Sequence, residues 1–205
     1  MIHKLLATIL AASLPSMALA EPRMPDIPSV TSVLETIGIQ GDELDVDMDI
    51  HGWSDGDYNI RDSFLNIDID VDRESDGETW RFGGDVDGRG LRGEVEKKSD
   101  DSYEIWGGGL NVDMRRRGTD NWEISGFVDE VNGSNHIDIT LRQRGGPGCY
   151  DVWEHGVDLD VNRWASSTSL RGDIEVEKFG KNALALTAIF IAVLQSELDT
   201  QQSKP

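Results

Sequence analysis

Apolar and acidic residues alternate along much of the chain. The first run covers residues 44–50, where single aspartates separate the apolar side chains, and a second run covers residues 65–71. A period of two places the apolar side chains on one face of a strand and the carboxylates on the other. This pattern is typical of an antiparallel sheet that is covered on one side only.

Similar runs continue to residue 176, and turn dipeptides such as Asp76-Gly77 and Asn132-Gly133 separate them. Nine or ten strands at hairpin spacing predict a mainly β protein, an antiparallel meander that forms an up-and-down barrel or a sandwich. Between Ile105 and Leu110 the apolar positions change parity across three glycines, which predicts a bulge or a barrel corner there.

A helical pattern flanks the strands on each side. Apolar residues at positions 30, 33, 34 and 37 predict a short N-terminal amphipathic helix. Residues 183–194 are apolar on all sides except at Thr187. This stretch is short for a membrane span, so we expect a buried C-terminal helix that packs on the barrel or caps its open end.

Two short echoes occur within the strand region. The run that starts at Leu65 recurs at Leu110, and Leu91-Arg92-Gly93 recurs at Leu170, so the spacings are 45 and 79 residues. A propeller or solenoid would hold one period. We therefore interpret the echoes as similar demands on each hairpin rather than as a regular repeat.

Residues 1–20 have the features of a secretory signal peptide. Lys4 precedes an uncharged apolar stretch, and Ala18-Leu19-Ala20 forms a small-x-small cleavage site, so Glu21 is the expected mature N-terminus. We expect a Pro-rich leader with the short helix at residues 21–42, a β domain at 43–180, and the apolar helix with a polar tail at 181–205. The protein is then exported, to the periplasm or the extracellular space.

Charge narrows the range of partners. The chain has 39 Asp and Glu against 19 Lys and Arg, a net charge of −20. Such an excess of carboxylates repels nucleic acids and anionic lipid headgroups. The single Cys, Cys149, supplies neither an internal disulfide nor a multi-thiolate metal site. We expect an unidentified ligand, a polymer or an envelope protein as partner.

One segment resembles a catalytic motif. Gly52-Trp53-Ser54-Asp55-Gly56 matches G-x-S-x-G, but the residues that follow do not begin the helix that a nucleophile elbow requires. We therefore interpret Ser54 as a turn residue. Carboxylates are so numerous that no catalytic pair stands out, and no residue is assigned a catalytic role.

The six tryptophans fall into two groups. Trp80 and Trp122 share the parity of their apolar neighbours, which predicts core positions. The other four lie near turns or off the apolar stripe and are the ligand-binding candidates: Trp53, Trp106, Trp153 and Trp164. Aromatic rings presented beside carboxylates suit sugar stacking.

Two acidic rows are the candidate metal ligands. We expect no cofactor except calcium, which would need the first row to lie beside the second: Asp45, Asp47 and Asp49 beside Asp68, Asp70 and Asp72. The alternative is that arginines on neighbouring strands pair with these carboxylates, or that water solvates them.

These features predict a non-catalytic protein of the cell envelope or secreted space with a binding or structural role. The first alternative is an outer-membrane barrel, in which the apolar strand faces contact lipid and the aspartates face an aqueous lumen. The second is an exported hydrolase of unassigned type, supported by the carboxylates, Ser54 and the histidines at positions 51, 136 and 155.

Overall fold

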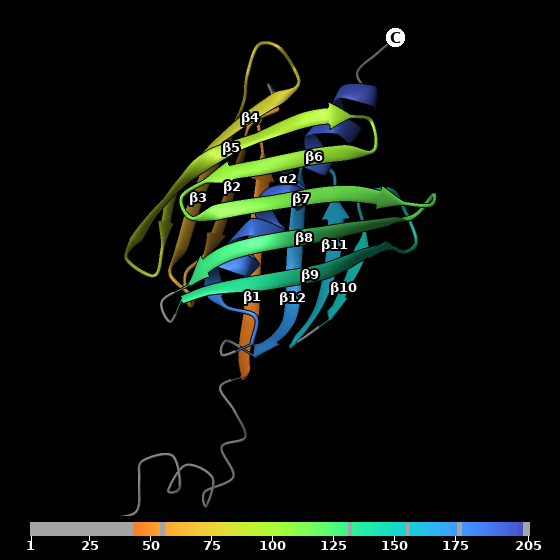
Figure 1. The fold of residues 1–205 in the computed structure, drawn as a ribbon. Helices are drawn as coiled ribbons and strands as arrows, with labels where there is room; N and C mark the ends of the chain where they lie inside the picture. Colours follow the sequence, from red (N-terminus) through yellow and green to blue (C-terminus); the bar gives the residue numbers. More distant parts are fainter. Residues whose placement is uncertain (1–42, 54–55, 131–132, 155, 176–177, 203–205) are drawn as a thin grey trace, which may run out of the picture. The chain divides into compact units, whose positions relative to one another are not determined.

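The computed structural model describes residues 43–53, 56–130, 133–154, 156–175 and 178–202. In this part of the chain, twelve antiparallel strands close into one barrel, and β1 pairs with β12 to complete the ring (Figure 1). The strands are β1 (Glu43–Gly52), β2 (Tyr58–Asp62), β3 (Ile67–Arg73), β4 (Thr79–Val86), β5 (Arg89–Ser99), β6 (Ser102–Gly107), β7 (Leu110–Arg117), β8 (Asn121–Glu130), β9 (Gly133–Gln143), β10 (Tyr150–Glu154), β11 (Val157–Trp164) and β12 (Ser167–Glu175). The predicted antiparallel meander is confirmed as a barrel, but the expected count of nine or ten strands is wrong.

The two strands that the sequence pattern missed, β2 and β10, are the shortest, with five residues each. In β2 one of the few inward positions is Asp62, whose exposed fraction is only 2%. The Asp62 carboxylate accepts hydrogen bonds from the backbone N–H groups of Phe64 and Leu65 at 2.9 and 3.0 Å. A run this short, with a carboxylate on its inner face, carries too little periodicity to predict a strand.

Helix α2 (Lys181–Gln202) runs inside the barrel (Figure 1). It contacts β1, β2, β3, β4 and β8, and every residue from Ala183 to Ser196 is buried. The helix is long and apolar enough to cross a membrane, but 78% of its most apolar stretch is buried in the fold. A helix that is apolar on all sides buries its whole surface only where walls surround it. The expected position on the barrel or over its end is therefore wrong, because α2 is the centre of the core.

The strands turn their apolar face toward this helix. In β3, for example, Ile67, Ile69 and Val71 are at most 2% exposed, while the aspartates between them point outward. The barrel thus has an apolar interior and a polar outer surface. The expected N-terminal helix at residues 30–37 lies outside the described residues.

The parity change at the three glycines marks a hairpin, which corrects the expected bulge. Gly107 pairs with Leu110, so Gly108 and Gly109 form a two-residue turn between β6 and β7. The φ angles of the three glycines are 104°, 60° and 82°, a region that favours glycine. Across such a turn an odd-numbered residue pairs with an even-numbered one, so the apolar parity must change. The register irregularity lies instead in β5, between Lys97 and Ser99.

The pairing registers reveal a threefold repeat of four strands, β1–β4, β5–β8 and β9–β12. The three tyrosines of the chain lie near the start of β2, β6 and β10, at spacings of 45 and 47 residues, and each is at most 4% exposed. They pair with equivalent residues of the next strand: Tyr58 with Val71, Tyr103 with Met114 and Tyr150 with Val161. Burial raises the pKa of all three hydroxyls, that of Tyr150 to about 12.

A glycine in the last strand of each unit follows the same register. Gly84, Gly126 and Gly172 pair with Ile69, Val112 and Leu159. A Cβ atom on these glycines would lie 2.1, 2.3 and 2.0 Å from the carbonyl oxygens of Asp68, Asn111 and Asp158. Each repeat therefore requires a bare backbone at this point.

The two sequence echoes do not belong to this repeat, because neither of them joins equivalent positions. The echo at Leu65 and Leu110 is two residues out of register, because Leu110 is equivalent to Ile67. The echo at Leu91 and Leu170 compares β5 with β12, which are not equivalent strands. The true repeat became visible only through strand pairing.

Candidate functional site

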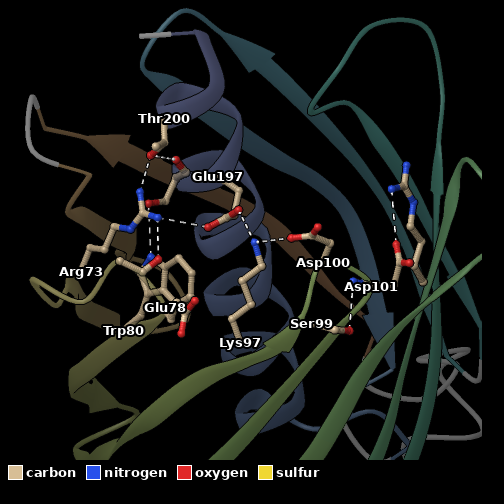
Figure 2. A network of polar contacts seen from close by, with 12 residues as sticks. Arg73, Glu78, Trp80, Lys97, Ser99, Asp100, Asp101, Glu197 and Thr200 are labelled. Carbon is tan, nitrogen blue, oxygen red and sulfur yellow. Dashed lines mark hydrogen bonds and ion pairs between the residues drawn. The ribbon is translucent and has the colours of Figure 1, made fainter. Parts of the chain in front are cut away.

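Charged residues gather where the last turns of α2 meet the barrel wall. Figure 2 shows Arg73 from β3 and Lys97 from β5 directed at the Glu197 carboxylate, at 3.2 and 2.9 Å. These three side chains are only 15–17% exposed. The Trp80 indole N–H also donates to the Ser196 hydroxyl at 3.2 Å. The network fixes the helix, because each charge has a partner across the gap between helix and wall.

A second pair of contacts holds the same end of α2. The Tyr58 hydroxyl donates to Asp199 at 2.5 Å, and Arg163 forms an ion pair with the same carboxylate. Burial, and then the hydrogen bond to Asp199, raise the pKa of Tyr58, so the hydroxyl stays protonated and remains a donor. Arg163 is the equivalent in β11 of Arg73 in β3. Two equivalent arginines of the wall, Arg73 and Arg163, therefore hold the last turns of α2 by ion pairs with Glu197 and Asp199.

The tryptophans separate as their parity indicated. Trp80 and Trp122 are buried in the core. The four candidates for ligand binding are exposed by 68%, 48%, 74% and 77%: Trp53, Trp106, Trp153 and Trp164. These large indole rings face solvent on the outer surface, Trp106 with about half of its area.

Trp53 borders a hollow of about 430 Å³ on the outside of β1, β2 and β3. The other lining residues are His51, Gly52, Asn59, Arg61 and Asp70. The backbone N–H of Trp53 donates to the Asp57 carbonyl at 2.8 Å, and this bond holds the backbone of the residue that carries the indole ring.

Hydrogen bonds hold the polar side chains of this hollow in place. The Asn59 amide donates to Asp70 at 2.8 Å and to Asp68 at 3.2 Å, while Arg61 pairs with Asp68 at 3.2 Å. His51 Nδ1 lies 3.1 Å from the Ser167 hydroxyl. The hollow thus combines one exposed aromatic face with positioned donors and acceptors, as ligand sites for polar molecules do.

Trp153 borders a second hollow, of about 350 Å³, on the outside of β9, β10 and β11. Its other lining residues are Thr140, Arg142, Asp151 and Asp158. Arg144 pairs with Asp151 at 2.8 Å and with Asp160 at 2.7 Å, and these ion pairs hold the two carboxylates in place. An exposed indole again lies beside arginine and aspartate.

The other two tryptophans lie apart from these linings. Trp106 is in β6, in line with Asn111 and the exposed Phe127, whose ring packs edge-on against His136 at 5.2 Å. Trp164 pairs with Ser167, the residue that contacts His51, so it flanks the first hollow. The sequence pattern singled out His51 and Asp70 for other roles, and it missed Asn59 and Arg61 because they belong to the unrecognised strand β2.

The two acidic rows do not lie on neighbouring strands. β2 separates β1 from β3, and Arg171 of β12 pairs with Asp47 and Asp49 at 2.5 and 3.0 Å. Among the described residues, no group of three or more His, Cys, Asp or Glu side chains is arranged to hold a metal ion. Calcium binding at these rows stays a prediction for all six aspartates: Asp45, Asp47, Asp49, Asp68, Asp70 and Asp72.

Comparison with known proteins provides no relative: no family model, no curated protein and no solved structure matches this chain.

Proposed function

We propose that the chain is an exported, non-catalytic binding protein that holds a sugar polymer at exposed tryptophans on the outer face of its barrel. The observation that carries this proposal is the hollow beside Trp53, where an indole exposed by 68% borders hydrogen-bonded polar side chains. The predicted ligand candidates Trp53, Trp106, Trp153 and Trp164 supply the aromatic surface.

The filled interior supports a site on the outer face. In many small barrels a ligand occupies the lumen. Here α2 occupies it, and buried side chains surround the helix between Ala183 and Ser196. A ligand therefore binds without displacing the core only if it binds outside.

The chemistry of the first hollow favours a carbohydrate. A pyranose ring presents C–H groups on its face and hydroxyls around its rim. An exposed indole covers the apolar face, and the hydroxyls both donate to and accept from side chains such as Asn59 and Asp70. The net charge of −20 opposes acidic polymers, so the polymer consists of neutral or amino sugars.

The alternatives fit less well. An outer-membrane barrel needs an apolar outer surface and a polar lumen, whereas this barrel has the opposite polarity. For a serine hydrolase, the strand-to-helix turn of an elbow is lacking, since β2 begins at Tyr58, two residues after Gly56. Ser54 itself lies outside the described residues.

Affinity electrophoresis through gels that contain a neutral or amino-sugar polysaccharide tests the proposal. We expect retardation of the wild type by at least one such polymer, and a loss of at least fivefold in affinity for Trp53→Ala. Phe64→Ala is the matched control, because Phe64 is 74% exposed but lines neither hollow. Equal retardation of Trp53→Ala and wild type by every polymer that retards the protein would contradict the assigned site.

Export of the protein is tested separately. Mass spectrometry of the protein from its native source should find Glu21 as the N-terminus, because cleavage is expected after Ala20. A chain that retains residues 1–20 in the cytoplasm would contradict export.

A further inference from the structure

The hollows beside Trp53 and Trp153 occupy the same place in two copies of the repeat. His51 faces Asn59 across β1 and β2, and Arg142 faces Asp151 across β9 and β10. One outward position further along, Arg61 of β2 is equivalent to Trp153 of β10, because both lie three residues after the buried tyrosine. Two separate parts of the chain thus build one type of site.

In the second copy of the repeat, different side chains occupy the equivalent positions and pair with one another. There Glu96 faces Glu104, and Lys98 forms ion pairs with both carboxylates, at 2.6 and 3.0 Å. Trp106 lies at the place of Trp153, but it is only 48% exposed. The polar groups of this copy are committed to one another rather than open to a ligand.

We propose that the protein is bivalent and bridges two polymer chains, one at the Trp53 hollow and one at the Trp153 hollow. This inference rests on the proposed function, because it assumes that the first hollow binds sugar. The polymer class is the same for both sites, since each presents one highly exposed indole beside arginine and aspartate.

The position of the hollows around the ring favours two chains over one. β2 and β10 are four strand spacings apart in a barrel of twelve strands. At about 4.8 Å per spacing, this is about 20 Å of curved wall. The sites therefore face different directions, and a stiff polysaccharide cannot bend around the wall to fill both. Two sites on one rigid body instead give avidity and cross-linking with long polymers.

Calorimetric titration tests the proposal. The titrant is a hexasaccharide fragment of a neutral or amino-sugar polymer that retards the protein. We expect two equivalents to bind the wild type, one to bind Trp53→Ala, one to bind Trp153→Ala, and none to bind the double variant. Phe64→Ala should keep two equivalents, because Phe64 is 74% exposed but lines neither hollow. Circular dichroism verifies that the variants, all changed at exposed positions, remain folded.

A bridging measurement completes the test. The wild type should increase the turbidity of the long polymer, and each single variant should lose this effect while it still binds one hexasaccharide. A single equivalent for the wild type, or turbidity that survives in Trp153→Ala, would overturn bivalency and leave the proposed function intact. If no neutral or amino sugar binds the wild type at all, both the proposed function and bivalency are wrong.

Discussion

At the scale of single residues, substitution of a repeated glycine should destabilise the fold by a measurable amount. A Cβ at Gly84 would lie 2.1 Å from the Asp68 carbonyl oxygen, which is backbone and cannot rotate away. We expect Gly84→Ala to reduce the free energy of unfolding by about 1–3 kcal/mol, as overpacking does. Urea unfolding measures this loss. Gly90→Ala in β5 is the control, because no atom lies within 4 Å of its Cβ position; equal losses in both variants would contradict the close approach.

Glu130 caps the N-terminus of α2 from the end of β8. Its carboxylate accepts a hydrogen bond from the Ala183 N–H at 3.0 Å, and burial raises its pKa above the ordinary value of a glutamate. A raised folded-state pKa adds stability that is fully present below the unfolded pKa and is lost as pH rises through the folded pKa. We expect Glu130→Gln, which keeps the acceptor without the charge, to be more stable than wild type at pH 7 and equal to it in acid.

Thermal melts of wild type and Glu130→Gln from pH 4 to 8 measure this difference. Glu130→Ala should lose about 1 kcal/mol in acid, because it removes the cap, and less at pH 7, where the wild type no longer has the stability of the protonated carboxyl group. A Glu130→Gln variant that is less stable than wild type at pH 7 would mean that the charge itself stabilises the helix end.

At the scale of elements, Glu197 attaches α2 to the wall. Its removal leaves Arg73 without its carboxylate partner and Lys97 with Asp100 alone, at positions that are 15% and 17% exposed. We expect Glu197→Gln to destabilise the protein by about 3 kcal/mol, because a largely buried pair is broken on one side. Chemical denaturation measures it. Lys98→Gln is the control on the open surface, where we expect no resolvable change. Comparable losses of stability in the two variants would contradict the claim that Glu197 attaches α2 to the wall.

The sequence predicted the elements where a pattern is long enough to count. Runs such as residues 44–50 and 65–71 alternate over seven positions; the first lies within β1, and the second lies in β3 from Ile67 onward. β2 and β10 were missed because five residues provide too few inward positions, and one of these in β2 is Asp62. The uniformly apolar face of α2 predicted burial, but its position inside the barrel depends on ring closure, a long-range property.

The candidate site was predictable only in part. Parity separated Trp53 and Trp153 from the core tryptophans Trp80 and Trp122, since an indole off the apolar stripe points outward. Their neighbours were not predictable, because Arg142 meets Asp151 only through the pairing of β9 with β10. The same reason concealed the repeat, whose spacing varies with loop length while its register is constant.

At the scale of the whole molecule, a net charge of −20 makes stability depend on salt. We expect added salt to raise the melting temperature, because it screens repulsion among surface carboxylates. Calcium and sodium at matched ionic strength should act alike, since Arg171 and Arg61 already pair with both acidic rows. A rise specific to calcium in melts at constant ionic strength would instead support a calcium site at those rows.

The central claim is that the outer face of the barrel binds the ligand while α2 fills the lumen. Nuclear magnetic resonance of the six tryptophan indole N–H groups tests it most directly, because each group reports one position. When the hexasaccharide that binds in the calorimetric titration is added, we expect the Trp53 and Trp153 signals to shift while those of Trp80 and Trp122 stay unchanged. Shifts confined to Trp80 and Trp122 would place the ligand inside the barrel and contradict the account.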